Sequence, residues 1–222
     1  MINERETVVG SLSSARSTPR VLSVNVGTVR EVAWRGETVT TGIWKESVAG
    51  RVAVRGVNLA GDDQADRTVH GGVDKAVYAY AREDYDYWRD HEGVETSPGL
   101  FGENLTLEGL ELSAALAGER WKVGTTVLEV AQPRLPCFKL GIRLSDPRFP
   151  RRFQHVGRMG AYLRIVSEGD VGAGDAVEIV SRPDHGVTLQ HMVRALHDPA
   201  SAEALWRVER LPVFWRQVAD RV

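Results

Sequence analysis

The sequence has almost no cysteine, no long apolar run and no excess of charge of one sign. Only one of its 222 residues is Cys, which excludes an intramolecular disulfide and any Cys-x-x-Cys zinc or redox motif. No apolar run approaches the roughly 20 residues that span a bilayer, and the N-terminus lacks the basic-then-apolar order of a signal peptide. The formal net charge of −2 gives no basic bias towards nucleic acid. We therefore expect a cytoplasmic globular protein that binds neither membranes nor nucleic acid.

Several common catalytic motifs are also missing. No Gly-x-x-x-x-Gly-Lys-Ser/Thr loop and no Gly-x-Gly-x-x-Gly run opens a helix, so P-loop and Rossmann nucleotide sites lack support. No Gly-x-Ser-x-Gly elbow is present. The function must be carried by other residues.

Short apolar or alternating stretches, separated by Gly, Pro or Asp, run through the middle of the chain. They lie at 21–26, 52–57, 76–80, 104–107, 126–130, 161–166 and 176–180. This spacing is typical of an all-β sandwich or barrel. One helix is expected over 82–91, where Tyr85 and Trp88 share a face. The glycine-rich segment 169–175 indicates a tight turn.

The composition divides the chain into three parts. Residues 1–19 are polar and Ser-rich, which predicts a flexible leader, and residues 20–182 form the predicted β-barrel domain. After Thr188, a plausible N-cap, apolar residues recur at helical spacing, and Asp198-Pro199 interrupts them. We predict three short helices over 183–222. Because about 40 residues rarely bury an adequate core alone, this segment should pack on the barrel or on a partner.

The single cysteine lies in a cationic loop that contains two prolines. Arg134 and Lys139 flank Cys137, and positive charge beside a sulfur favours the thiolate. Pro133 and Pro136 stiffen the approach to it. These neighbours favour a reactive thiol or a metal ligand, although a small buried packing residue stays open, because free Cys is often buried.

The polar segment 61–75 is a second candidate. Gly71 and Gly72 allow backbone conformations closed to other residues and let a ligand approach the main chain. His70 and Lys75 carry groups that bind an anion or place a proton. A long solvated turn explains this segment equally well.

Two more segments carry candidate ligand contacts. In the segment 98–105, Asn104 offers donors and acceptors to a heterocycle edge, although a hairpin turn explains that segment better when it is taken alone. In the segment 157–160, Arg158 presents a guanidinium suited to phosphate. A surface turn is an equal alternative there.

Taken together and in order, these segments resemble the MOSC family, named for the C-terminal domain of molybdenum cofactor sulfurases, and are most similar to its YiiM-like bacterial branch. The resembling residues are Gly61-Asp62-x-Gln64-Ala65-Asp66, His70-Gly71-Gly72-x-x-Lys75-Ala76-Val77-Tyr78, Pro98-Gly99-x-Phe101-Gly102-Glu103-Asn104-Leu105-Thr106, Gln132-Pro133-Arg134-x-Pro136-Cys137-x-Lys139 and Gly157-Arg158-x-Gly160-x-Tyr162. Each motif alone is weak, but five in order around one Cys are specific. The resemblance covers roughly 21–182, and the tail is similar to the three-helix extension of that branch.

The resemblance implies a fold, a cofactor and a site. The fold would be mainly β, a closed barrel of the pyruvate-kinase-β-barrel type with the small helical extension. The cofactor would be the molybdenum cofactor, a pterin, with Cys137 as the molybdenum ligand; pyridoxal phosphate binding is a further property of the family. The implied catalytic residues are Cys137 and His70. The implied cofactor-binding residues are Lys75, Gly71, Gly72, Asn104, Arg134, Lys139 and Arg158.

The implied function is a molybdenum-dependent oxidoreductase that reduces N-hydroxylated purines, pyrimidines or amidines. Since the chain has no flavin, haem or iron–sulfur motif, the electrons should come from a separate reductase. One alternative is a non-enzymatic sulfur or cofactor carrier that holds a persulfide on Cys137. A second is a small-anion binding module whose Cys is structural. A homodimer is left open.

Overall fold

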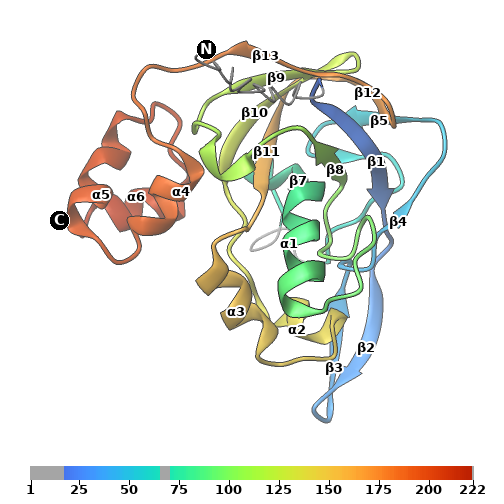
Figure 1. The fold of residues 1–222 in the computed structure, drawn as a ribbon. Coiled ribbons are helices and arrows are strands. Elements are labelled where there is room, and N and C mark those ends of the chain that lie inside the picture. The colour runs from blue at the N-terminus through green and yellow to red at the C-terminus, as the bar shows by residue number, and fades with distance from the viewer. Residues whose placement is uncertain (1–17, 66–70, 222) are drawn as a thin grey trace, which may run out of the picture.

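The computed structural model describes residues 18–65 and 71–221, and within these ranges the strands form one large sheet and two small ones (Figure 1). The eight strands of the large sheet follow the order β13-β9-β10-β11-β7-β8-β1-β4. They are β1 (Arg20–Val26), β4 (Glu46–Ser47), β7 (Val77–Ala81), β8 (Leu105–Glu108), β9 (Arg120–Val123), β10 (Thr126–Pro133), β11 (Ala161–Ser167) and β13 (Val177–Ser181). Neighbours pair antiparallel except β7 and β8, which are parallel.

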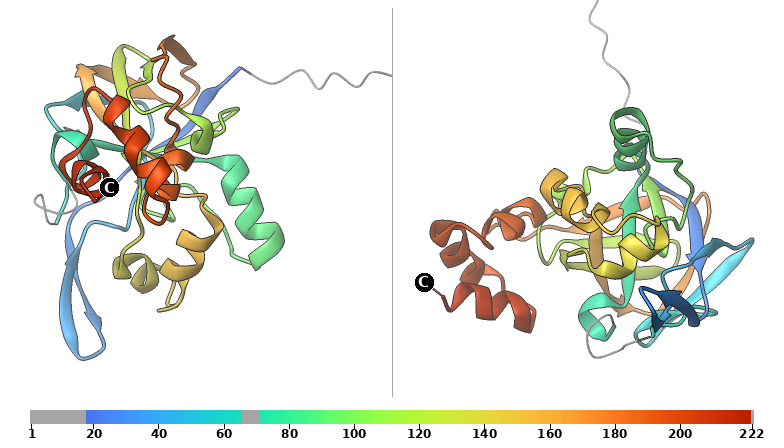
Figure 2. Two further views of the ribbon diagram at one scale, coloured as in Figure 1. Left: turned by 90° about the vertical axis from the view of Figure 1, so that its left-hand side faces the viewer. Right: turned by 90° about the horizontal axis from the view of Figure 1, so that it is seen from below.

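The two small sheets lie beside the large one. One has the order β12-β5-β6 and consists of β5 (Arg51–Arg55), β6 (Asn58–Leu59) and β12 (Gly169–Gly172). The other is the hairpin of β2 (Arg30–Trp34) and β3 (Glu37–Thr41), which projects from the body of the molecule (Figures 1 and 2). At its base the chain returns to the large sheet through β4.

The central strand β7 explains why the sheet is covered on both faces. All five residues of β7 are buried. Successive side chains of a strand point to opposite faces, so Val77, Ala79 and Ala81 join one apolar cluster and Tyr78 and Tyr80 join another. An apolar strand without polar alternation is the pattern expected for burial on both sides.

Helices cover the second cluster and form the C-terminal part. They are α1 (Arg82–Glu92), α2 (Phe138–Arg143), α3 (Phe149–Val156), α4 (Leu189–Arg194), α5 (Pro199–Ala204) and α6 (Val213–Ala219), with the short 3-10 helices η1 (Val73–Lys75), η2 (Leu112–Ala114) and η3 (Leu205–Arg207). Trp88 of α1 stacks on Phe153 of α3 with ring centroids 5.5 Å apart. The helices α4 to α6 lie to one side of the sheet (Figures 1 and 2), and buried residues of this part, such as Leu205 and Trp215, belong to the first cluster.

The mainly β character predicted from the sequence is confirmed. Each of the seven predicted strands overlaps an observed one, and the helix predicted over 82–91 is α1. The predicted turn at 169–175 is wrong in its first half, because β12 pairs there with β5. A Cβ on Gly169 would lie 2.4 Å from the Thr125 carbonyl carbon, so glycine at this position permits a close backbone approach rather than a turn.

The predicted closed barrel is not found. The described ladders leave the large sheet open, with β13 and β4 at its ends. An isolated bridge between Arg20 and Ala176 brings β1 next to the start of β13, and Val21 N donates to Asp175 O at 2.9 Å. Gly174 N donates to Val21 O and Val177 N donates to Pro19 O, both at 2.8 Å, but these bonds do not extend into a ladder between the described parts of β1 and β13.

The other boundaries of the prediction have mixed outcomes. In the described part of the C-terminal segment the chain forms α4, α5, η3 and α6, not three helices, because the end of α5 tightens into the 3-10 turn η3. Of the predicted leader, residues 1–17 lie outside the described residues. The division between residues 182 and 183 stays a prediction.

Candidate functional site

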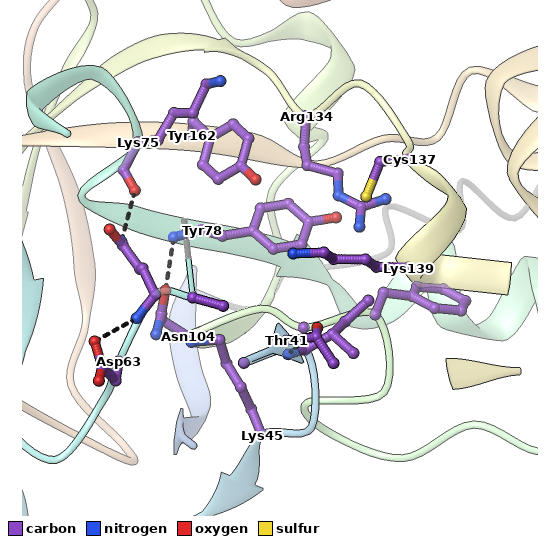
Figure 3. A pocket seen from close by; sticks show the side chains of 16 residues that line it. Thr41, Lys45, Asp63, Lys75, Tyr78, Asn104, Arg134, Cys137, Lys139 and Tyr162 are labelled. Atoms are coloured by element: carbon purple, nitrogen blue, oxygen red, sulfur yellow. Dashed lines mark hydrogen bonds between the residues drawn. The ribbon is translucent and has the colours of Figure 1, made fainter. Parts of the chain in front are cut away.

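A cavity opens where the ends of β7 and β10 meet the segment that follows β3 (Figure 3). It holds about 590 Å³ of space when its open mouth is counted. Its described lining residues are Thr41, Gly42, Ile43, Lys45, Asp63, Gln64, Ala65, Lys75, Tyr78, Phe101, Gly102, Asn104, Arg134, Cys137, Lys139 and Tyr162. Residues distant in sequence therefore converge on one space.

Arg134 is the most unusual side chain in the cavity. It follows β10, is 5% exposed, and its Nη1 has no hydrogen-bond partner among the described residues. Its guanidinium carbon lies 5.7 Å from the Tyr78 ring centre and 5.6 Å from that of Phe153. Burial lowers the pKa of Arg134, but the interactions with Tyr78, Tyr162 and Cys137 raise it by more, so the net shift is upward. A permanent buried cation thus keeps one donor free for a ligand.

Cys137 lies three residues beyond Arg134, immediately before α2. Its carbonyl accepts from Leu140 N at 3.0 Å, which fixes the turn into the helix, and its side chain is half-buried. Figure 3 shows the sulfur next to the Arg134 guanidinium, with Lys139 extending across the cavity below them. The sequence-predicted trio of Arg134, Cys137 and Lys139 therefore meets at one place.

Lys75 comes from the opposite wall, at the end of η1. The turn into η1 begins at Gly72, whose φ of 87° favours glycine. Lys75 Nζ lies 6.0 Å from the Tyr162 ring centre, and Gln64 Nε2 donates to the Lys75 carbonyl at 3.3 Å. Gly71 and Gly72 support this wall without lining the cavity. His70 lies outside the described residues, so its predicted catalytic role stays a prediction.

Asn104 lines the cavity, but its side-chain amide makes hydrogen bonds to other groups of the protein. Its Oδ1 accepts from Tyr78 N at 3.0 Å and its Nδ2 donates to Asp62 Oδ2 at 2.9 Å. Asp62 Oδ1 accepts from Gly27 N at 2.9 Å and from Lys45 Nζ. Asn104 therefore joins β7 to the wall that carries Lys45, and its predicted contact with a heterocycle stays a prediction.

Lys45 is held in this wall by a buried ion pair. The exposed fractions of the Lys45 and Asp62 side chains are 8% and 0%. Burial lowers the pKa of Lys45, and the Asp62 carboxylate only partly opposes this. Lys45 therefore contributes to the cavity a cation that is desolvated and fixed in position.

Arg158 is a further predicted cofactor-binding residue that does not line the cavity. Its Nη1 donates to Asp84 Oδ1 at 2.6 Å, and its guanidinium carbon lies 4.7 Å from the Tyr87 ring centre. Burial raises the pKa of Asp84, while the Arg158 partner opposes the shift. In this structure Arg158 ties α1 to the turn before β11.

The site residues predicted from the sequence do not include several side chains of the cavity, among them Tyr78, Tyr162 and Lys45. Tyr78 and Tyr162 are Cα partners across β7 and β11, and burial raises the pKa of both, so both present neutral hydroxyls. Both lie in apolar strands, where the sequence predicts that an aromatic residue packs in the core. Lys45 had no signal, because it follows a hairpin that the sequence did not predict.

The cavity carries an excess of positive charge. Its described lining contains the cations Lys45, Lys75, Arg134 and Lys139 against the single carboxylate of Asp63. Three cations from separate walls and one buried unpartnered donor suit an anionic group, such as a phosphate. The half-buried thiol adds a soft ligand for a metal at the same place.

The described residues contain neither a conventional metal cluster nor a membrane span. No group of three or more His, Cys, Asp or Glu side chains in this part of the chain could hold a metal ion. No helix here is both long and apolar enough to cross a bilayer.

Comparisons with known proteins agree with the motifs. A family model described as the MOSC domain matches residues 66–178. The uncharacterized protein YflK of Bacillus subtilis is 35% identical over 189 residues, which are 85% of this chain and 86% of that protein. A Gibberella moniliformis protein called a reductase is 34% identical over 167 residues, which are 73% of this chain but only 29% of that protein. The crystal structure of YiiM from Geobacillus stearothermophilus superposes with a TM-score of 0.75 at 28% identity, over 91% of this chain and 98% of that one.

Proposed function

The chain belongs to the MOSC domain family, and we propose that its cavity binds a molybdenum cofactor with Cys137 as a ligand of the metal. We further propose that the loaded protein reduces N-hydroxylated compounds of the hydroxylaminopurine or amidoxime type.

The observation that carries this proposal is the pairing of Arg134 with Cys137. A buried guanidinium with an unpartnered Nη1 is costly unless a ligand completes its hydrogen bonds. It lies beside the only thiol of the chain (Figure 3). An anion and a soft metal in the same ligand would satisfy both groups.

The donor set suits a phosphorylated pterin that carries molybdenum. The phosphate would take Arg134 and the surrounding lysines, Lys45, Lys75 and Lys139, as partners. The thiolate of Cys137 matches the soft sulfur ligands that the cofactor already contributes. When bound in its reduced form, the cofactor would supply a metal that takes the oxygen atom from the substrate and gives up two electrons in doing so. Pyridoxal phosphate would share the phosphate contacts but gives the thiol no role, so we do not propose it.

The overall reaction needs two electrons and two protons. The N–O bond of the substrate breaks, the nitrogen takes up one proton to become an amine or amidine, and the hydroxyl takes up the other proton and leaves as water. We propose that the electrons come from a separate reductase protein. In the relative named a reductase the matching segment is only 29% of the protein, which supports the idea that such a segment works together with further parts of a reductase.

A carrier function is the second candidate, and it is favoured by the position of Cys137 at a half-open site. Phe138, the next residue, is 54% exposed, so a partner could reach this rim. In that case the sulfur would hold a persulfide and the purified protein would carry no molybdenum.

Metal content and a reduction assay test the proposal together. Protein made in a cofactor-competent host should contain close to one molybdenum per chain and reduce N-hydroxyadenine with an artificial electron donor. Cys137→Ala should fold normally but lose both the metal and the activity. Arg158→Lys is the matched control, because Arg158 lies outside the cavity lining, and it should keep both. A metal-free wild-type protein with a persulfide on Cys137 would replace this proposal with the carrier.

A further inference from the structure

Two hydrogen-bonded connections run from the C-terminal helices to opposite walls of the cavity. The first begins at Trp215 of α6, which is fully buried. Its Nε1 donates to Gln132 Oε1 at 2.9 Å. Gln132 lies in β10 two residues before Arg134, so this bond holds the strand end that leads to Arg134 and Cys137.

The same glutamine also reaches the other wall. Gln132 Nε2 donates to the carbonyl of Asp74 at 3.3 Å. Asp74 lies in η1, directly before Lys75. The amide of Gln132 thus joins the Arg134 wall, the Lys75 wall and the tail with one planar group.

The second connection passes through Arg164 of β11. This side chain is 3% exposed, and three of its nitrogens are bonded: Nε to Asp74 Oδ1 at 2.5 Å, Nη1 to Glu129 Oε1 at 2.9 Å and Nη2 to the carbonyl of Arg210 at 2.6 Å. Arg210 lies between η3 and α6. The position of Asp74 therefore depends on a contact with the tail.

A buried polar network with its partners in place holds its members in one arrangement, because breaking any bond leaves a desolvated group behind. Here the network spans the gap between the two cationic walls. It contributes no group to the cavity lining itself.

We propose that the C-terminal helical segment positions the cavity, with Trp215 acting through Gln132 and Arg164 acting through Asp74 to set the spacing of Lys75 against Arg134 and Cys137. Trp215 and Arg164 are thus positioning residues. The proposal concerns the geometry of the same site, but it does not depend on which group the cavity binds.

The single cysteine makes the spacing measurable in full-length protein made without cofactor. Alkylation of Cys137 by iodoacetate, an anion, is compared with alkylation by iodoacetamide, which is neutral. The ratio of the two rates reports the positive potential at the sulfur, since intrinsic thiol reactivity affects both reagents. Arg134→Met should lower this ratio and so calibrates the assay.

Trp215→Phe removes the indole donor and keeps an aromatic ring. We expect the iodoacetate-to-iodoacetamide ratio to fall by about threefold as Arg134 and Lys75 separate, which follows from the distance dependence of charge interactions. Trp121→Phe is the control: Trp121 is also buried, its Nε1 donates to Glu119 at 2.6 Å, and neither residue lines the cavity. It should lose similar packing and leave the ratio unchanged.

A double-mutant comparison separates positioning from general loosening. In a Gln132→Met background, Trp215→Phe should change the ratio no further, because the path through Gln132 is already broken. The proposal is overturned if Trp215→Phe leaves the ratio unchanged, if Trp121→Phe lowers it equally, or if the two changes simply add. Because the assay uses protein without metal, absence of molybdenum from the wild type would defeat the proposed function and leave this result standing.

Discussion

Two buried arginines of this protein differ in their hydrogen-bond partners. Arg164 is bonded to two carboxylates and a carbonyl, whereas Arg134 interacts with Tyr78 and Tyr162 and its Nη1 has no hydrogen-bond partner among the described residues. Removing one member of a buried ion pair leaves an uncompensated charge, but removing a cation whose neighbours are tyrosines leaves no such charge. Arg164 therefore serves the fold, and the charge of Arg134 is kept for a ligand.

Substitution of each arginine by methionine should separate these roles. We expect Arg134→Met to change the free energy of unfolding by less than about 1 kcal/mol, or to raise it, and Arg164→Met to lower it by about 3–5 kcal/mol. Arg134→Met should also weaken pyrophosphate binding at least about tenfold. Urea unfolding measures the change in stability. The degree to which pyrophosphate protects Cys137 from alkylation by iodoacetamide measures the change in binding. A strongly destabilised Arg134→Met protein would show that this arginine is structural.

The Lys45–Asp62 pair gives a prediction for pH. Burial lowers the Lys45 pKa below its ordinary value of 10.5, and Asp62 limits the shift. Between the lowered value and the ordinary one only the unfolded chain holds the proton, so stability rises with pH in that window. Asp62→Asn removes the interaction that limits the shift, so the pKa of Lys45 should fall further. Each further pKa unit should add about 1.4 kcal/mol to the rise in the free energy of unfolding across the window.

The measurement is the free energy of unfolding from pH 7 to pH 10. Asp62→Asn should gain more stability than the wild type across this range, although it starts lower. Parallel curves for the two proteins would contradict the assignment of Lys45 as the titrating group. Asp198→Asn is a suitable control, because that carboxylate caps α5 through Ser201, far along the chain from Lys45.

Side chains that the sequence groups together also meet in the structure where they are neighbours in the chain, although their roles stay predictions. Arg134, Cys137 and Lys139 lie within six positions of one another, so a single loop places them at the cavity. Arg158 had the right chemistry, but its partner Asp84 lies 74 positions away. Such a partner leaves no local pattern in the sequence.

At the scale of elements, glycines let two segments form one wall of the cavity. Gly99 has a φ of 81°, and a Cβ there would lie 2.5 Å from the carbonyl oxygen of Lys45. The next glycine of this loop, Gly102, has a φ of 82°, and a Cβ there would lie 2.9 Å from Ile43 Cγ1. The loop before β8 therefore presses directly on the segment that carries Lys45.

Gly99→Ala should consequently disturb both the fold and the site. The left-handed backbone and the overlap together should lower the free energy of unfolding by about 2–4 kcal/mol. Gly36→Ala, at a φ of 85° with nothing within 4 Å, should cost only the backbone term of about 1–2 kcal/mol. Only Gly99→Ala should also weaken pyrophosphate binding. Equal losses in the two variants, with binding intact, would argue against the contact between the two segments.

Strands were predictable where apolar residues formed a run or an alternation between turn residues. The strands β1 and β7 are rich in buried residues and were found, whereas the mostly exposed β2–β3 hairpin was missed. Its turn is Arg35-Gly36, both with positive φ, and Arg is not among the residues that usually signal such a turn. Missing this hairpin also concealed the wall with Lys45.

At the scale of the whole molecule, the sheet and the C-terminal helices share one apolar core. Buried residues of the tail, including Met192, Leu205 and Trp215, belong to the same cluster as Val77 and Leu163 of the central strands. A core of this kind predicts that the two parts unfold together. The same arrangement underlies the proposed control of the cavity by the tail.

Removal of residues 185–222 should therefore expose apolar surface of the sheet. We expect the truncated chain to aggregate, and the full chain to unfold in one transition whose midpoint is the same by far-UV circular dichroism and by tryptophan fluorescence. Trp206→Ala is the control within the tail, since Trp206 is 55% exposed, and it should leave that midpoint nearly unchanged. A truncated chain that stays soluble and equally stable would contradict the shared core.

The proposed function depends on whether Cys137 binds molybdenum. X-ray absorption at the molybdenum edge, on wild-type protein and on the Cys137→Ser variant loaded with cofactor in the same host, examines that bond directly. The account predicts one sulfur neighbour fewer around the metal in the variant. Identical sulfur coordination in the two proteins, with equal metal content, would show that the thiol is not a ligand.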